Sequence, residues 1–158
     1  MKNIIIGAGG HAKVLKDILC ETKNIIVAIV DPQNILNENF YNLIHLKNDK
    51  DILNSYDTNE HRLVMGIGLV PGKNRFLRKE LFLLYTNYGY SFENLIHSSA
   101  ILSSNTSLEM GVQIMAGSII QTGSRIAENT IINTGVILDH DCRIGKHSHV
   151  APGTIICG

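Results

Sequence analysis

Residues 96–158 read IHSSAILSSNTSLEMGVQIMAGSIIQTGSRIAENTIINTGVILDHDCRIGKHSHVAPGTIICG, and an aliphatic residue stands at every sixth position. A small residue follows four places after each of the first ten, from Ala100 to Thr154. A period of six is a multiple of the two-residue strand period and does not fit a helical turn, so the stretch must be extended. We therefore expect a stack of short strands in a parallel β-helix, in which each aliphatic side chain packs on those of neighbouring coils. The aliphatic positions are Ile96, Leu102, Leu108, Ile114, Ile120, Ile126, Ile132, Leu138, Ile144, Val150 and Ile156.

These hexads resemble those of the left-handed β-helix acyltransferases. The left hand is implied by the resemblance alone, because a period of six does not fix it. In that family three hexads form one triangular coil, so the hexads here would give three coils and a third. From the repeat alone, a structural solenoid without chemistry remains an alternative.

The composition argues against several kinds of partner and site. Fourteen basic residues balance fourteen acidic ones without a basic run, so neither a nucleic acid nor an anionic membrane is favoured. The three cysteines, Cys20, Cys142 and Cys157, are odd in number and lack C-x-x-C spacing, so neither a disulfide framework nor a zinc site is indicated. No apolar run approaches the roughly 18 residues of a membrane span and no signal peptide is recognisable, so we expect a cytoplasmic protein.

The first part of the chain has the pattern of an α/β domain. An aliphatic run enters a glycine turn, a helical pattern follows, and a second aliphatic run closes at Asp31, which together make a βαβ unit. Residues 32–48 are polar and irregular. We expect one domain at 1–90 and the β-helix at 91–158, with strands at 2–6, 25–30 and 63–67 and helices at 12–20, 49–56 and 76–88, the last ended by Gly89.

The glycine turn predicts a site for a phosphorylated ligand. Residues 7–12, GAGGHA, satisfy G-x-G-x-x-[GA], and Asp31 closes the second strand, as in the Rossmann dinucleotide pattern. Glycine permits a close approach of the backbone, and the following helix presents N–H groups to a phosphate. Two alternatives stay open: a turn needed only for packing, and a small NAD-binding oxidoreductase.

The whole chain resembles the bacterial sugar acetyltransferases of the sialic acid O-acetyltransferase and nucleotide-aminosugar N-acetyltransferase type. These enzymes join a small Rossmann-like sugar-binding domain to a left-handed β-helix. The matching stretches are IGAGGHA at 6–12, GIG at 66–68, NLIHSSA at 94–100, NTGVILDHDC at 133–142 and HVAPG at 149–153.

The resemblance implies roles for individual residues. His140 would be the general base, Asp141 would orient its imidazole, and Asn133 would lie beside the reaction centre. His149 would contact acetyl-CoA, the acetyl donor. Some relatives have Glu where this chain has Asp141, whose shorter arm changes the hydrogen-bond reach. The acceptor, a nucleotide sugar or sialic acid, would be surrounded by Gly9, Gly10, His11, Asp31 and Gly68.

Spacing within the coil bears on where the site is assembled. If a coil takes three hexads, His140 and His149 lie half a turn apart and on different sides of the prism. We hypothesise that the site forms between neighbouring chains of a homotrimer, with His140 from one chain and His149 from the next. His97 is expected to be a structural hydrogen-bonding residue and His147 to be exposed.

These observations favour an acetyl-CoA-dependent acetyltransferase that acts on a sugar in bacterial surface-glycan biosynthesis. A small NAD-binding oxidoreductase and a non-catalytic nucleotide-sugar-binding protein remain alternatives. The base can serve an amine or a hydroxyl, so the sequence names neither the acceptor sugar nor the acetylated atom. The hexads stop at Gly158, whereas members of the resembled family continue with further coils and a cap. We therefore expect the β-helix to be the first part of a longer, here truncated, domain.

Overall fold

The computed structural model describes residues 1–33, 38–69 and 76–158. It divides into two compact units, Met1–Glu93 and Asn94–Gly158. The first unit extends slightly past the expected boundary at residue 90 because the next residues pair with the strand at His61–Met65. There the N–H of Leu63 donates to the carbonyl of Ser91 at 3.0 Å, and the carbonyl of Leu63 accepts the N–H of Glu93 at 2.8 Å. No helix of the described ranges has both the length and the apolar character that a membrane crossing requires.

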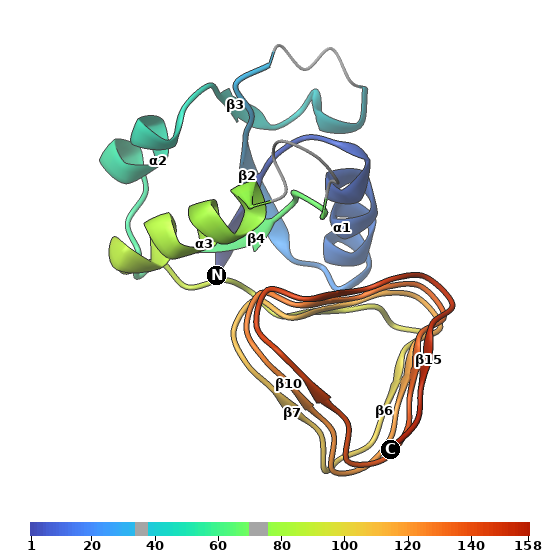
Figure 1. The fold of residues 1–158 in the computed structure, drawn as a ribbon. Coiled ribbons are helices and arrows are strands. Elements are labelled where there is room, and N and C mark those ends of the chain that lie inside the picture. Colours follow the sequence, from blue (N-terminus) through green and yellow to red (C-terminus); the bar gives the residue numbers. More distant parts are fainter. Residues whose placement is uncertain (34–37, 70–75) are drawn as a thin grey trace. The chain divides into compact units, whose positions relative to one another are not determined.

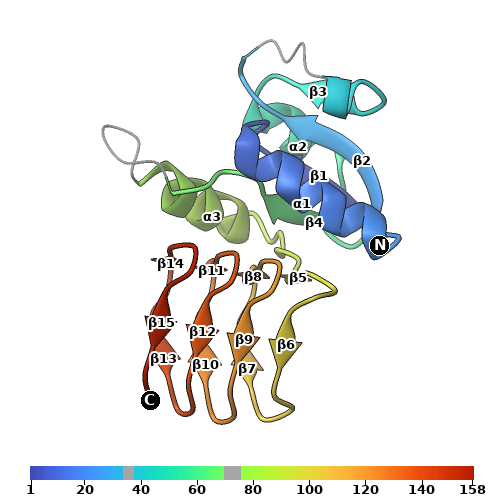
Figure 2. The same cartoon turned by 90° about the vertical axis from the view of Figure 1, so that its right-hand side faces the viewer.

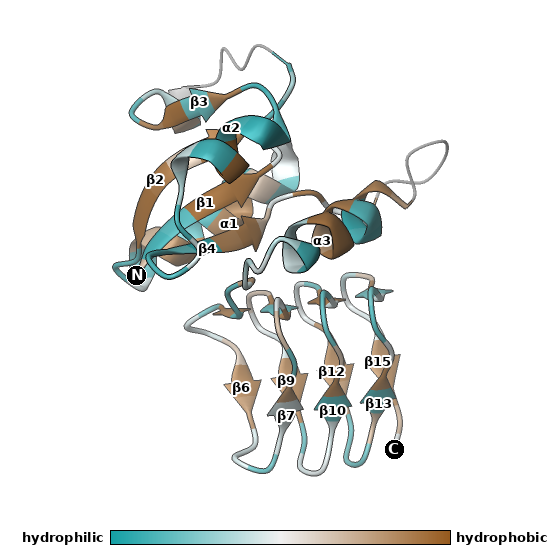
Figure 3. Ribbon diagram, turned by 90° about the vertical axis from the view of Figure 1, so that its left-hand side faces the viewer, coloured by the Kyte–Doolittle hydropathy of each residue, from teal (hydrophilic) through white to brown (hydrophobic). Residues whose placement is uncertain are grey.

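The first unit is built on a parallel four-stranded sheet in the order β3-β2-β1-β4. The strand order reverses direction between β1 and β4. Helices α1 and α2 lie on opposite faces of the sheet (Figures 2 and 3). The strands are β1 (Lys2–Ile6), β2 (Ile25–Val30), β3 (Ile44–Leu46) and β4 (His61–Met65), and the helices are α1 (Gly10–Glu21), the 3₁₀ turn η1 (Glu38–Phe40), α2 (Asp49–Ser55) and α3 (Leu77–Asn87).

Hydrophobic pattern explains most of these elements. The last four residues of β1 are buried, as a strand covered on both faces requires. One face of α1 buries Ala12, Leu15, Ile18 and Leu19. On α3 the buried Phe82 stacks on Phe92 with ring centroids 4.6 Å apart. All expected helices are present with small shifts of their ends.

Strand β3 was not expected, because its segment reads as polar and irregular. It contributes only three residues at the edge of the sheet, and Ile44 at its start is 58% exposed. A run that short has too few alternations to stand out as a strand. Part of the same segment, residues 34–37, lies outside the described residues.

The second unit is a parallel β-helix of two-residue strands. Viewed end-on in Figure 1 each coil is a triangle, and Figure 2 shows the coils stacked side by side. Strands β5, β8, β11 and β14 form side 1 of the prism, β6, β9, β12 and β15 side 2, and β7, β10 and β13 side 3. The strands are β5 (Leu95–Ile96), β6 (Ile101–Leu102), β7 (Ser107–Leu108), β8 (Gln113–Ile114), β9 (Ile119–Ile120), β10 (Arg125–Ile126), β11 (Ile131–Ile132), β12 (Ile137–Leu138), β13 (Arg143–Ile144), β14 (His149–Val150) and β15 (Ile155–Ile156).

The strand register confirms the expected coil of three hexads. Ile119 pairs with Ile137 and Ile137 with Ile155, so equivalent positions are eighteen residues apart. From β6 onward the second residue of each strand points inward, and these side chains form one core with Val112, Val136 and Cys142. The stacked parallel strands fit the left-handed β-helix that the resemblance implies.

The corners explain the rest of the hexad. A residue with positive φ recurs at every sixth position, where the chain turns from one side to the next. The next residue is small, and at Ser118, Ser124 and Thr130 its hydroxyl donates to a backbone carbonyl of the next coil at 2.9 Å. Five of the positive-φ corners are glycine, namely Gly111, Gly117, Gly123, Gly135 and Gly153, and three are Asn129, Asp141 and His147.

The outer faces of sides 2 and 3 differ in polarity. Every outward residue of side 2 is isoleucine, and Ile101 and Ile155 are 63% and 67% exposed. Side 3 instead presents a serine and two arginines. Figure 3 shows the contrast between the brown strands of side 2 and the teal strands β10 and β13 of side 3. The four isoleucines, called the isoleucine ladder below, are Ile101, Ile119, Ile137 and Ile155.

Candidate active site

His140 and Asp141 lie together at the corner between sides 2 and 3, directly after β12. Nδ1 of His140 is 3.0 Å from Oδ2 of Asp141, and the backbone N–H of His140 donates to Oδ1 of Asp139 at 2.8 Å. Asp141 adopts a left-handed backbone with φ of 59°. Five of the eight equivalent corners carry glycine, so the backbone of Asp141 adopts a conformation that few residues with a side chain tolerate.

The contact fixes the tautomer of the imidazole. A carboxylate oxygen only accepts, so Nδ1 carries the proton and Nε2 keeps its lone pair. The side chains of His140 and Asp141 are 60% and 76% exposed, so a substrate can reach Nε2. An exposed pair of this kind contributes little to stability. The contact instead orients the imidazole, because the hydrogen bond holds the ring in one tautomer and one direction.

Glycines lie on both sides of this pair along the prism axis. A Cβ added to Gly123, one coil before Asp141, would stand 2.2 Å from its Oδ1. A Cβ added to Gly158, one coil after His140, would stand 2.5 Å from the carbonyl oxygen of His140 and 2.9 Å from its ring. Both glycines therefore leave the space that the pair occupies.

Asn133 and His149 form a second pair at the corner between sides 1 and 2. Nδ2 of Asn133 is 2.9 Å from Nε2 of His149, and Oδ1 of Asn133 accepts the N–H of Thr134 at 2.8 Å. The resemblance places Asn133 beside the reaction centre. One side of the triangle separates the two corners, up to about 20 Å for six extended residues. Within one chain the structure therefore joins His140 with Asp141 and Asn133 with His149, and keeps the two pairs apart.

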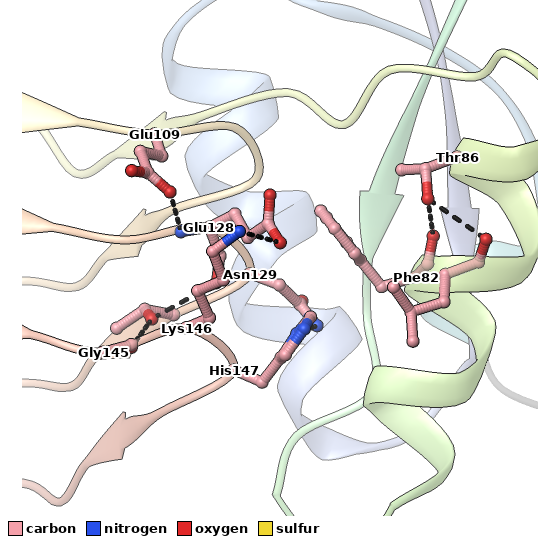
Figure 4. Close-up of polar contacts among 10 residues, drawn as sticks. Phe82, Thr86, Glu109, Glu128, Asn129, Gly145, Lys146 and His147 are labelled. Atoms are coloured by element: carbon pink, nitrogen blue, oxygen red, sulfur yellow. Dashed lines mark hydrogen bonds and ion pairs between the residues drawn. The ribbon is translucent and has the colours of Figure 1, made fainter.

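The other two histidines of this unit have structural contacts. Nδ1 of His97 accepts the N–H of Ser99 at 3.1 Å, as expected for a structural residue. His147 was expected to be exposed, which is wrong: it is half-buried, and its Nδ1 lies 2.9 Å from Nδ2 of Asn129. Figure 4 shows this corner, where Lys146 also pairs with Glu128 at 3.0 Å.

The first unit contains a pocket of about 470 Å³ at the carboxyl ends of β1, β2 and β4. This is where the strand order reverses, the usual place for a ligand in an open parallel sheet. The pocket is lined by all five residues expected at the acceptor, Gly9, Gly10, His11, Asp31 and Gly68, together with residues that were not expected, among them Gln33, Asp49, Leu77 and Leu81.

Asp31 shapes the glycine turn. Its Oδ2 accepts the N–H of Ala8 and its Oδ1 accepts that of Gln33, both at 2.9 Å. In a dinucleotide site the equivalent acid would bind the ribose hydroxyls. Here one carboxylate oxygen holds the glycine turn and the other holds the residues that follow Asp31.

Two further features position the glycine loops. Gly7, with φ of 87°, packs so closely on Ile67 that a Cβ would lie 2.6 Å from its Cγ1. Arg78 on α3 is buried and donates from Nη1 to the carbonyls of Met65 at 3.1 Å and Ile67 at 2.6 Å. Burial lowers the pKa of Arg78 to about 9, so the guanidinium is still charged at neutral pH. Arg78 thus fixes the loop after β4, which forms part of the pocket wall.

Comparison with known proteins agrees with both units. The PglD N-terminal domain family matches residues 2–82. PerB from Caulobacter crescentus, in complex with CoA and GDP-perosamine, is 36% identical over 100% of this chain and 72% of that chain, with a TM-score of 0.85. A mutant of perosamine N-acetyltransferase from the same organism, with the same ligands, is 34% identical with a TM-score of 0.86.

Two more solved structures share the fold. The acetyltransferase domain of PglB from Neisseria gonorrhoeae FA1090, in complex with acetyl coenzyme A, is 28% identical over 98% of this chain and 72% of that chain, with a TM-score of 0.84. WeeI from Acinetobacter baumannii AYE is 16% identical over 100% of this chain and 73% of that chain, with a TM-score of 0.80, which shows the fold alone. The chain belongs to the family of hexapeptide-repeat sugar acyltransferases that carry a PglD N-terminal domain.

Proposed function

We propose that this chain transfers the acetyl group of acetyl-CoA to an amino group of a nucleotide-linked sugar. The observation that carries the proposal is the contact between Nδ1 of His140 and Oδ2 of Asp141, which leaves Nε2 as an exposed base. The PerB complex with CoA and GDP-perosamine supports both substrates, and the N-acetyltransferase relative favours an amine over a hydroxyl. Residues 1–90 serve as a Rossmann-like domain for the acceptor, and residues 91–158 carry the base.

His140 acts while the new amide forms. The sugar amine attacks the thioester carbonyl as Nε2 accepts the proton that the nitrogen loses. A bond forms between nitrogen and the acetyl carbon, the carbon–sulfur bond breaks, and the CoA thiolate recovers the proton from the imidazolium. Asp141 stabilises the imidazolium between these events.

The pocket of the first unit takes the nucleotide end of the acceptor. The glycine turn lets a ligand approach the backbone, and α1 begins at Gly10, where its N–H groups favour a phosphate. His11 and Gly68 lie next to each other in the lining, since a Cβ on Gly68 would lie 3.5 Å from Cβ of His11. The NAD-binding alternative is not favoured, because the similar solved structures carry CoA and GDP-perosamine.

The reaction centre lies between chains of a homotrimer. The isoleucine ladder supports this assembly, because it exposes an apolar stripe between the corner of His140 and that of Asn133 and His149. A neighbouring chain packed on that stripe would bring its own His149, the proposed acetyl-CoA contact, to His140.

Mixing two inactive variants tests the shared site. His140→Ala and His149→Ala are purified, dissociated, mixed in equal amounts and reassociated. If each site takes one histidine from each of two chains, about a quarter of the sites regain both, from one half times one half. Activity near that fraction, with neither variant active alone, supports the shared site. A fully active monomer in sedimentation, or no recovery in verified mixed trimers, contradicts it.

A further inference from the structure

Side 3 of the β-helix carries two arginines on neighbouring coils. Arg125 of β10 pairs in register with Arg143 of β13, and Ser107 of β7 continues the column one coil below. The alternate residues Ile126 and Ile144 point inward to the core, so both guanidinium groups stand on the outer face. Parallel strands lie about 4.8 Å apart, which brings the two charges side by side. We call this pair the arginine ladder.

The acidic residue that lines the groove beside the ladder, Asp141, pairs with His140 and not with an arginine. Within residues 1–33, 38–69 and 76–158, neither Arg125 nor Arg143 has an ion-pair partner. The cation at the next corner differs, since Lys146 pairs with Glu128 at 3.0 Å. Like charges directly opposite one another on neighbouring strands repel. A bound anion would remove that repulsion, because one phosphate can accept from both planar guanidinium groups.

The ladder forms one wall of a polar groove that extends to Asp141, the partner of the base. The groove measures about 450 Å³ and also contains Asp141, whose Oδ2 is held by Nδ1 of His140. Its remaining lining includes the polar residues Ser104, Asn105 and Ser107, whereas the hydroxyl of Ser124 already donates to the carbonyl of Asp139. A ligand whose anionic part lies beside the arginines therefore shares the groove with the carboxylate that holds His140.

The distance between the anion and the reacting group selects the substrate. Arg143 follows Asp141 by two residues on the same coil, so the anion must be close to the acetylated atom. In a nucleotide sugar one sugar ring separates the sugar-linked phosphate from the acceptor amine. In acetyl-CoA the whole pantetheine arm separates the diphosphate from the thioester. We propose, on the basis of the function above, that Arg125 and Arg143 bind the sugar-linked phosphate of the nucleotide-sugar acceptor.

Neutral variants of the ladder test this assignment. Arg125→Gln, Arg143→Gln and the double variant are compared with wild type, and Lys146→Gln serves as the matched control because it removes an exposed cation from another corner. The double variant should raise the KM for a nucleotide aminosugar about 10- to 100-fold, as expected for lost charge-assisted hydrogen bonds. The KM for acetyl-CoA should stay within about twofold, and the control should change neither value.

Equilibrium binding separates this proposal from the proposed function. Calorimetry with the nucleotide sugar, without acetyl-CoA, measures the ladder independently of turnover. Binding that weakens in the double variant supports the ladder even if wild type transfers no acetyl group. An active wild type whose double variant binds the nucleotide sugar unchanged overturns the ladder alone. The ladder is also overturned if only the KM for acetyl-CoA rises, or if the double variant sediments differently from wild type. Arginine-dependent binding of free sialic acid, without binding of the nucleotide sugar, would overturn it too, because the bound anion would then be a carboxylate.

Discussion

Replacing Gly123 by alanine places a methyl group against the carboxylate of Asp141. The new Cβ would stand 2.2 Å from Oδ1, so the carboxylate must move by about 1 Å to reach an ordinary contact distance. The displaced group is the end of a flexible side chain, and the fold can absorb it. Displacements of this size in a catalytic group lower rates by up to about 10²-fold. We expect kcat to fall about 10- to 100-fold, or about 1.4–2.7 kcal/mol.

Gly117→Ala is the matched control. Gly117 has φ of 68° and Gly123 has φ of 76°, so alanine is strained by about 1–2 kcal/mol at either position. A Cβ on Gly117 meets nothing within 4 Å. Both variants should therefore lower Tm by a few degrees, while only Gly123→Ala should lower kcat.

The assay follows CoA release under saturating substrates, with thermal unfolding measured in parallel. Asp141→Gly supplies the reference, because glycine tolerates φ of 59° and removes the carboxylate without adding strain. Combining Gly123→Ala with Asp141→Gly should lower kcat no further than Asp141→Gly alone. Equal kcat values for the Gly117 and Gly123 variants, or fully additive losses in the combined variant, would show that the methyl group does not act through the carboxylate of Asp141.

Three further changes have expected outcomes. Tyr85→Phe removes a hydrogen bond of 2.5 Å to Asp49 and should lower the unfolding free energy by about 1–3 kcal/mol at neutral pH. Burial raises the pKa of Tyr85, so the stability contributed by its neutral form is present below pH of about 10 and lost as pH rises above that value. Denaturant titrations from neutral to alkaline pH should show a steeper loss in wild type than in Tyr85→Phe, and parallel curves would contradict this. His149→Ala should weaken acetyl-CoA binding more than acceptor binding in calorimetry, and the reverse order would remove its assigned role. Arg78→Met should raise the KM for the acceptor more than that for acetyl-CoA, with partial recovery in Arg78→Lys, whereas equal changes in both constants would make Arg78 a general stability residue.

The β-helix could be predicted from the sequence because its main determinant is local and repeats. Each inward aliphatic residue, such as Ile120 or Leu138, occupies the same place in every hexad, so the period alone reports the extended backbone. The glycine turn at residues 7–10 was similarly accessible, because strand, turn and helix follow one another directly. Strand β3 could not be predicted from the sequence, because its three residues are held by pairing with β2 and are too few to show a pattern of their own.

The site contacts could be predicted only in part. His140 and Asp141 are sequence neighbours, whereas the contact between Asn133 and His149 depends on the coil bringing residues of successive turns together. The exposed charge of Arg143 and the burial of Arg78 have no local signal, because both stand in ordinary amphipathic segments. The importance of Gly123 becomes visible only when Asp141 is seen lying over it.

The central claim is that His140 is the base for acetyl transfer from acetyl-CoA to a nucleotide aminosugar. The most direct measurement compares wild type and His140→Ala by mass spectrometry of the sugar product, with binding of both substrates checked by calorimetry. We expect a product heavier by one acetyl group in wild type, and a rate about 10²- to 10⁴-fold lower in the variant with both ligands still bound. Unchanged turnover in a folded His140→Ala variant would contradict it.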